Sequence, residues 1–318
     1  MARRMKFAEF KRRLQSRRLS SEDIEDYLEI DPTAPQIRVR FRPGTLEDLP
    51  PEDYDVDHAL YLYQRARDRA REKTTVRTAK PRVVAEGDSW FHLPLIVRPT
   101  AIATHIHDNG GFLVRNIARW GDTLQGMLVR KEYLNVIKSF DPAWFIFSGG
   151  GNDVQEALAK RELLFDYDPA RPLENSVTPK GEALLSQIGT GYQTLLREVM
   201  ERFPNLPVLC YGYDYPRPDV ADGRYIGRYL REQGYPTQTM RPLLEIILDR
   251  LNEIIKRSVL SFPTGKFISC LRVTDPYTWF DDMHPDNDGF KVLAARFEAR
   301  MKEWARSTRS ARKKSRRR

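Results

Sequence analysis

The sequence predicts an α/β protein in which a five-stranded parallel sheet is covered by helices on both faces. Its 318 residues, of which 41% are apolar, are enough to bury a large hydrophobic core. Five short apolar runs follow residue 81, and most are separated by stretches with helical periodicity. Strands that alternate with helices form parallel sheets, so we expect a three-layer α/β/α domain over residues 81–305.

The expected strands are rich in β-branched and aromatic residues, which favour extended structure. They are RVVAE from residue 82, FLVRNIA from 112, AWFIF from 143, PVLCYGY from 207 and KFISCLRV from 266. The expected helices span Asp122–Ser139, Lys180–Phe203, Arg241–Ser261 and Gly289–Ala305. Residues 166–179 and 214–242, rich in Pro, Tyr and Gly, are predicted to be long excursions above the sheet.

Residues 1–80 form a predicted N-terminal extension. Phe7, Phe10 and Leu14 lie at helical spacing among basic residues, which predicts a short amphipathic helix. Ser20 and Asp23 have the spacing of a capping box that begins a second helix. A loop with one edge strand at IRVRF and a charged helix over residues 57–73 should follow. The first helix could pack on the main domain, which we favour, or dock a partner protein.

The net charge of +9 is concentrated at the two ends of the chain. Residues 1–19 carry +7 and residues 306–318 carry +8, which together exceed the total and leave −6 on residues 20–305. The last thirteen residues contain no apolar side chain larger than Ala, so we expect a disordered basic tail. An alternative function follows from these ends: nonspecific binding of a polyanion, either nucleic acid or an anionic membrane, with the α/β domain as an inactive or secondary scaffold.

Composition also bears on cellular location and on cysteine chemistry. No apolar run approaches the roughly 20 residues of a membrane span, and the basic N-terminus lacks the apolar stretch of a signal peptide. We therefore predict a cytoplasmic protein without a transmembrane segment.

Cys210 and Cys270 are too few for a disulfide framework or a metal cluster, and each is expected to be a reduced thiol in a core strand.

Candidate functional residues follow four of the five predicted strands. In an open parallel sheet, ligands bind beyond the carboxyl ends of the strands, so these positions are where chemistry is expected. Ser89 follows the first strand in Gly87-Asp88-Ser89, and Gly121 follows the second in Arg119-Trp120-Gly121. A glycine run with Asn152 follows the third, and Asp281 precedes His284 by three residues after the fifth. Together they supply a hydroxyl nucleophile, a base, an orienting carboxylate and oxyanion donors, as acyl transfer requires.

These blocks closely resemble those of the SGNH hydrolase superfamily, the GDSL-type esterases and lipases. Gly87-Asp88-Ser89, Gly121, Gly150-Gly151-Asn152-Asp153 and Asp281-Asp282-Met283-His284 occur in the order that the family shows, over about residues 82–305. The resemblance implies a flavodoxin-like SGNH hydrolase fold. Two departures concern packing and substrate choice: Trp90 stands where the four-letter motif has Leu, and the N-terminal extension and the excursions are not part of the minimal domain.

The resemblance also implies roles for the site residues. Ser89 would attack an acyl carbonyl, His284 would act as general base, and Asp281 would orient and stabilise the imidazole. The N–H groups of Ser89 and Gly121 and the side-chain amide of Asn152 would hold the oxyanion. The substrate would be a carboxylic ester, such as the acyl or O-acetyl ester of a sugar, lipid or small metabolite, and no metal or other cofactor would be needed.

Other residues near these motifs have simpler interpretations. Asp88, Asp122 and Asp153 are expected to satisfy backbone N–H groups, and Asp282 is the second choice for the carboxylate of the triad. His105 and His107 are spaced as metal ligands can be, but no third ligand is suggested, so we expect packing or solvent roles.

Two further features remain open. His92 lies close to Ser89 in the sequence, and its role is undetermined. The excursion over residues 214–242 mixes tyrosines with arginines, which could bind a carbohydrate or an acidic group but more simply pack on the domain.

Overall fold

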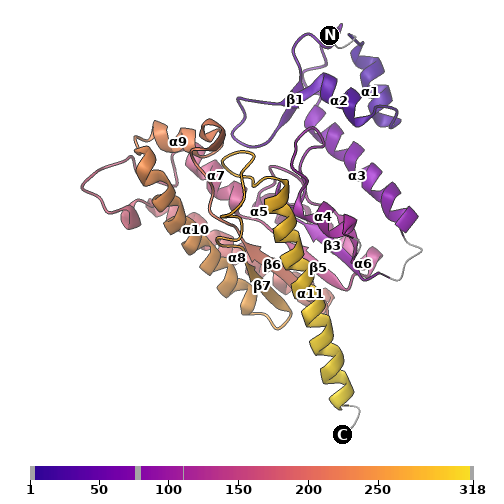
Figure 1. The fold of residues 1–318 in the computed structure, drawn as a ribbon, viewed down its shortest axis with the longest axis vertical. Helices are drawn as coiled ribbons and strands as arrows, with labels where there is room; N and C mark the ends of the chain where they lie inside the picture. The colour runs from indigo at the N-terminus through magenta and orange to yellow at the C-terminus, as the bar shows by residue number, and fades with distance from the viewer. Residues whose placement is uncertain (1–3, 76–79, 110, 316–318) are drawn as a thin grey trace.

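The computed structural model describes residues 4–75, 80–109 and 111–315, and its centre is a five-stranded parallel sheet (Figure 1). The strands lie in the order β4-β3-β5-β6-β7. Their bounds are Arg82–Glu86 for β3, Leu113–Asn116 for β4, Trp144–Phe147 for β5, Val208–Gly212 for β6 and Gly265–Ser269 for β7. Every predicted strand is present, and the predicted fold class is confirmed.

The strand order places a topological switch point beside β3. The chain passes from β3 outward to β4, then returns to pair β5 on the other side of β3, with Val84 between Arg115 and Phe145 in register. The crevice at such a reversal, beyond the carboxyl ends of the strands, is where open α/β sheets bind ligands. The segments that follow β3, β4 and β5 therefore meet at one place.

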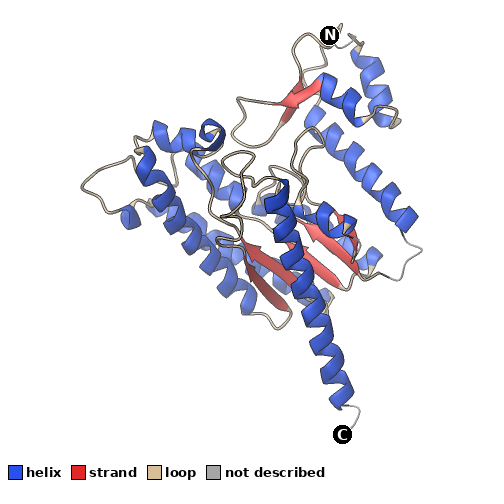
Figure 2. Ribbon diagram, viewed as in Figure 1, coloured by secondary structure: helices blue, strands red, loops and turns tan. Residues whose placement is uncertain are grey.

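Helices cover both faces of the sheet (Figure 2). Aromatic contacts of Phe145 and Phe147 place α6 (Glu132–Phe140) and α8 (Pro179–Arg202) on one face. Trp144 faces the opposite way and meets Trp304 of α11 (Asn287–Ser315), which packs beside α4 (Ile102–Asp108). The long helix α10 (Thr237–Leu260) packs against α8 and lies beside β6 and β7. These contacts make the three layers that the sequence predicts.

Two predicted segments differ from the structure. The helix expected over Asp122–Ser139 is two helices, α5 (Leu124–Arg130) and α6, because Lys131 between them adopts a left-handed conformation with φ of 49°. The tail from residue 306 was expected to be disordered, but α11 continues to Ser315 (Figure 1). The first half of α11 is stabilised by packing on the domain, and the Ala, Arg and Lys residues that follow are good helix formers, so the helix continues beyond the packed part. Residues 316–318 lie outside the described residues.

The buried apolar residues of the N-terminal extension are continuous with the hydrophobic core of the main domain. The extension contains five elements: α1 (Phe7–Gln15), α2 (Ser21–Tyr27), β1 (Leu28–Ile30), β2 (Val39–Phe41) and α3 (Val56–Thr75). β1 and β2 pair as an antiparallel ribbon, and the expected capping box of Ser20 and Asp23 is present. The Tyr61 hydroxyl on α3 donates to the Ile117 carbonyl of the main domain at 3.1 Å.

The apolar face of α1 is buried within the chain itself. Phe7, Phe10 and Leu14 are all buried, and Phe10 packs edge-on against Phe41 of β2. The helix therefore packs on other elements of the extension rather than on the main domain as expected, and the residues that a partner protein would need are already covered.

The excursions above the sheet are compact. They carry the 3₁₀ turns η1 (Leu173–Asn175) and η2 (Val220–Gly223) and the short helix α9 (Gly227–Glu232), while α7 (Gly151–Ala159) follows β5. Tyr213, Tyr215 and Tyr225 are buried, so the simpler interpretation of the aromatic excursion holds for them. Among the described residues, no helix is both long and apolar enough to cross a membrane.

The two cysteines are free and fully buried. Cys210 lies in β6 and Cys270 directly follows β7, as predicted for thiols of the core. Burial raises the pKa of both thiols, which keeps them protonated and unreactive.

Candidate active site

Ser89, His284 and Asp281 form a hydrogen-bonded chain at the carboxyl end of the sheet. The Ser89 hydroxyl lies 2.8 Å from Nε2 of His284, and Nδ1 of His284 lies 2.8 and 3.0 Å from the two carboxylate oxygens of Asp281. All three residues are almost fully buried. Residues 195 positions apart are thus arranged as nucleophile, base and orienting carboxylate.

The loop between β7 and α11 presets the geometry of the histidine. The Asp281 carboxylate accepts the backbone N–H groups of Met283 and His284 at 2.8 and 2.7 Å, in addition to the imidazole. Phe280 N–H donates to the His284 carbonyl, which closes the turn. Asp281, rather than Asp282, therefore lies next to the imidazole, as the Asp-x-x-His spacing predicts.

Two opposed effects act on the basicity of His284. Burial, the largest single effect, lowers the pKa of its imidazole, but the charge and hydrogen bond of Asp281 and the charges of Asp88 and Asp282 together outweigh it. The net result is a pKa above the usual value for histidine. An imidazole so placed is well suited to accept the Ser89 proton and to remain stable as imidazolium.

The three proposed oxyanion donors come from three different strand ends. Ser89 follows β3, and Gly121 follows β4 with φ of +70°, a conformation that favours glycine. Asn152 lies in the first turn of α7, where its amide nitrogen donates to the Asp122 carbonyl at 2.8 Å, so its side chain is held beside the Gly121 loop. In the part of the chain that the structure describes, the N–H groups of Ser89 and Gly121 donate to no protein acceptor.

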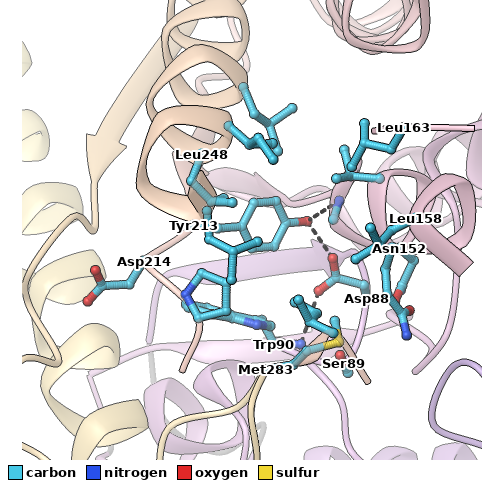
Figure 3. A pocket seen from close by; sticks show the side chains of 18 of the residues that line it. Asp88, Ser89, Trp90, Asn152, Leu158, Leu163, Tyr213, Asp214, Leu248 and Met283 are labelled. Carbon is cyan, nitrogen blue, oxygen red and sulfur yellow. Dashed lines mark hydrogen bonds between the residues drawn. The ribbon is translucent and has the colours of Figure 1, made fainter. Parts of the chain in front are cut away.

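Asp88 supports the turn that carries the nucleophile. Its carboxylate accepts hydrogen bonds from the Trp90 N–H at 3.0 Å and the Tyr213 hydroxyl at 2.5 Å (Figure 3), and also from the Ser148 hydroxyl at 3.2 Å. Burial raises the pKa of Asp88, an effect that these hydrogen bonds oppose. The expectation of a structural role is met. Sequence reasoning did not single out Ser148 or assign Tyr213 to the site, because no motif links them to Asp88.

Trp90, the departure from the four-letter motif, fills space behind the nucleophile. Its indole is 4% exposed and packs against Tyr211, Tyr213 and Phe290. It therefore changes packing beside Ser89 rather than adding a reactive group.

The remaining acids hold neighbouring backbone in place. Asp153 accepts the Leu124 N–H at the start of α5, and Asp122 forms an ion pair with Arg130. Burial raises the pKa of Asp122 to about 6, although Arg130 opposes the shift. Asp282 is fully buried and accepts the N–H groups of residues 225–227. Asp153 therefore has the role expected of it, whereas Asp122 pairs with a side chain instead of a backbone N–H.

An apolar cavity of about 60 Å³ opens beside Ser89 (Figure 3). Its walls include Leu158 of α7, Leu163 of the segment after it, Leu248 of α10 and Met283 of the loop before α11. Ser89 and Asn152 line the cavity at its polar end. An apolar group that enters it would therefore place its attachment point at the nucleophile.

A second, polar cleft of about 700 Å³ is lined by Gly121 and Thr123, together with Arg38 and Gln36 of the N-terminal extension and Lys160 at the end of α7. It shares no lining residue with the apolar cavity, although α7 contributes residues to both. The site therefore has an apolar compartment beside Ser89 and a polar one beside Gly121.

The remaining histidine candidates lie outside this site. His92 is buried with Nδ1 3.0 Å from the Ala118 carbonyl, so it supports the strand end that leads to Gly121. His107 accepts the Val114 N–H at 3.4 Å, and His105 is half-buried on α4. No group of three potential metal ligands occurs among the described residues.

Comparison with known proteins gives similarity at the level of solved structures. No protein-family model and no curated protein matches the chain. The chain is similar to the lipase Lip_vut3 from a goat rumen metagenome at 15% identity, covering 69% of this chain and 97% of that one with a TM-score of 0.49. It is also similar to an extracellular lipase from Streptomyces rimosus at 14% identity, covering 69% and 99% with a TM-score of 0.48.

A third similar structure is an acetyl xylan esterase from Geobacillus stearothermophilus, at 15% identity, with 70% of this chain and 94% of that one covered and a TM-score of 0.40. The fold and the site of this chain define, on their own geometry, an α/β/α protein with a serine–histidine–aspartate constellation. In its ordered motifs and its architecture, the chain resembles the SGNH hydrolases.

Proposed function

We propose that the protein is a serine hydrolase that cleaves carboxylic esters through an acyl-enzyme on Ser89. The observation that carries this proposal is the 2.8 Å contact between the Ser89 hydroxyl and Nε2 of His284, whose Nδ1 lies 2.8 Å from the Asp281 carboxylate. A serine hydroxyl is a weak nucleophile unless a neighbouring base removes its proton, and this arrangement supplies that base.

The reaction would proceed in two halves. His284 takes the Ser89 proton as Oγ attacks the ester carbonyl, and the negative charge passes to the carbonyl oxygen, near the N–H groups of Ser89 and Gly121 and the Asn152 amide. The ester C–O bond breaks as the imidazolium returns its proton to the departing alcohol. Water, deprotonated by His284, then attacks the acyl-enzyme and releases the carboxylic acid and free Ser89.

The apolar cavity supports a short, unbranched acyl chain as the group transferred to Ser89. A volume of 60 Å³ corresponds to about four to six water-sized positions, which suits a chain of about that many non-hydrogen atoms. Leu158, Leu163 and Leu248 offer no polar partner, so a charged or hydroxylated acyl group would lose its hydration there without compensation.

The polar cleft supports a polar alcohol as the leaving group. It is lined by Gly121, shares no lining residue with the apolar cavity, and has a volume in the range of small-molecule sites. Three of its four cations pair with acids, namely Arg119, Arg130 and Lys160. Arg38 has no such partner within the described residues and is available to a polar or anionic substituent of the alcohol.

The decisive experiment compares wild-type protein with Ser89→Ala on p-nitrophenyl esters from acetate to octanoate. We expect activity to be greatest near butyrate to hexanoate and to fall by about 10³-fold or more in the variant, because loss of a triad nucleophile leaves only residual catalysis. A fluorophosphonate should label wild type at Ser89 and leave Ser89→Ala unlabelled.

Ser186→Ala, a change to an exposed serine on α8, is the matched control and should retain full activity and labelling. Wild-type protein that neither turns over any ester nor reacts with the fluorophosphonate would contradict the proposal.

Cytoplasmic location remains a prediction. The alternative polyanion-binding function depends on the charge of the two ends alone, and no contact in the structure favours it.

A further inference from the structure

The N-terminal extension contacts the loop that carries Gly121 through a buried carboxylate. Asp57, near the start of α3, is 4% exposed and accepts the indole N–H of Trp120 at 2.7 Å and the backbone N–H of Val39 at 2.9 Å. Arg119 lies 3.4 Å from its other oxygen. One carboxylate of the extension thus ties its own strand β2 to the two residues that precede Gly121.

The segment between β1 and β2, residues 31–38, is fastened to the site from the opposite side. We call this segment the strap. Its backbone carbonyls accept hydrogen bonds from Arg224 to Asp31 at 2.7 Å, from Arg228 to Ala34 at 3.3 Å and from Gln155 to Pro35. The donors belong to α7 and to the excursion over residues 214–242, so the strap bridges both.

The strap also lies directly against the oxyanion residues. The Gln36 amide donates to the Asn152 carbonyl at 3.4 Å. A Cβ at Gly121 would lie 3.3 Å from the Ile37 carbonyl and 3.4 Å from the side-chain oxygen of Gln36, which shows how closely the strap packs on this loop. Two contacts therefore restrict the backbone of Gly121: the strap packs against it, and the preceding residue, Trp120, is hydrogen-bonded to Asp57.

We propose that the N-terminal extension is a working part of the active site, in which Asp57 is a positioning residue that fixes the 119–122 loop for oxyanion binding. The strap then forms the wall of the polar cleft on the alcohol side. This inference rests on the proposed function. Its physical basis is that an oxyanion donor contributes most when its direction is fixed before reaction, and Gly121 has no such constraint from β4 alone.

Asp57→Asn and Trp120→Phe test the positioning role from its two ends. Asp57→Asn removes the negative charge of the acceptor with little change in volume, and Trp120→Phe removes the indole N–H that donates to it. We expect kcat for p-nitrophenyl butyrate to fall by about 10- to 100-fold in each variant, which is less than the fall expected when an oxyanion donor is removed completely. KM should change by less than about twofold. The rate of fluorophosphonate labelling should fall in parallel, and the double variant should be no worse than the worse single variant.

Tyr63→Phe is the matched control. It removes a hydrogen bond of similar length, 2.7 Å from the Tyr63 hydroxyl to the Leu19 carbonyl, which also involves α3 but does not reach the active site. It should retain wild-type kcat. Folded Asp57→Asn and Trp120→Phe proteins with wild-type kcat would overturn the inference, as would an equal loss in Tyr63→Phe.

Hydrogen–deuterium exchange separates this inference from the proposed function. Peptides covering residues 117–124 should exchange faster in Asp57→Asn and Trp120→Phe than in wild type, whether or not the protein hydrolyses esters. Unchanged exchange in both variants would overturn the positioning role. Wild-type protein without esterase activity or Ser89 labelling would instead refute the proposed function, with the exchange result still deciding the role of Asp57.

Discussion

At the scale of single residues, the candidate site divides into groups that a sequence can reveal and groups that it cannot. Ser89, His284 and Asp281 lie in short motifs at strand ends, so their types and spacing predict the contact that the structure contains. Tyr213 and Asp57 support the same site, yet each reaches its partner across more than 60 residues of sequence. Only the folded chain shows such partners, because no local pattern specifies them.

The environment of His284 leads to a prediction about pH. The general base must be neutral, so kcat/KM should fall as the pH drops through the pKa of its imidazole, and that pKa is raised above about 6.5 by Asp281 despite burial. In Asp281→Asn the stabilising charge is gone while burial remains, so the acidic limb of the profile should move to lower pH. The maximum rate should also fall steeply.

The measurement is a pH series of kcat/KM for p-nitrophenyl butyrate in wild type and Asp281→Asn. Asp275→Asn, a change to a partly exposed acid that pairs with Arg217 away from His284, should leave the acidic limb in place. An acidic limb that stays at the wild-type pH in Asp281→Asn would contradict this account of the histidine.

At the scale of elements, hydrophobic pattern predicts the strands better than the helix ends. The five strands of the central sheet occur where apolar runs predict them, since each is short and most of their residues are buried. Lys131 divides a predicted helix because its left-handed conformation depends on how α5 and α6 pack, which a pattern of apolar residues does not encode. Asn152 was expected in a glycine-rich loop and instead lies in α7, whose start at Gly151 follows a glycine with φ of +99°.

The excursion over residues 214–242 is joined to the catalytic loop by Asp282. Its fully buried carboxylate accepts the N–H groups of Tyr225, Ile226 and Gly227, so Asp282→Ala would leave three buried donors without an acceptor. We expect the free energy of unfolding to fall by about 2–5 kcal/mol, measured by urea denaturation. Limited proteolysis should cut residues 216–232 faster than in wild type.

Asp219→Asn is the control for this prediction. Asp219 is an exposed acid of the same excursion, and its side chain makes no capping hydrogen bond to η2. Its replacement should therefore change the free energy of unfolding by no more than about 0.5 kcal/mol. Equal stability of Asp282→Ala and Asp219→Asn would show that the Asp282 hydrogen bonds do not hold the excursion.

At the scale of the whole molecule, the two basic ends have opposite relations to the fold. The N-terminal one is folded into the structure, with Phe10 and Leu14 almost fully buried and the strap beyond them lying on the oxyanion loop. The C-terminal one continues α11 away from the domain (Figure 1). The two ends thus differ in their relation to the fold although their charges are similar, because net charge carries no information about which end has apolar residues to bury.

Removing each end should separate these roles. A chain that stops after Ala305 keeps the buried Phe297 and Met301 of α11, so we expect unfolding free energy within about 0.5 kcal/mol of wild type and unchanged esterase activity. A chain that lacks residues 1–19 loses the burial of Phe10 and Leu14, each worth about 2–5 kcal/mol, and exposes the apolar surface of Phe41 and Tyr27 that they cover. Its activity should fall with its stability, since β2 and the strap lose their support. Urea denaturation and p-nitrophenyl butyrate turnover of both truncations provide the measurement, and an N-terminal truncation as stable and active as the C-terminal one would show that the extension folds independently of its first helix.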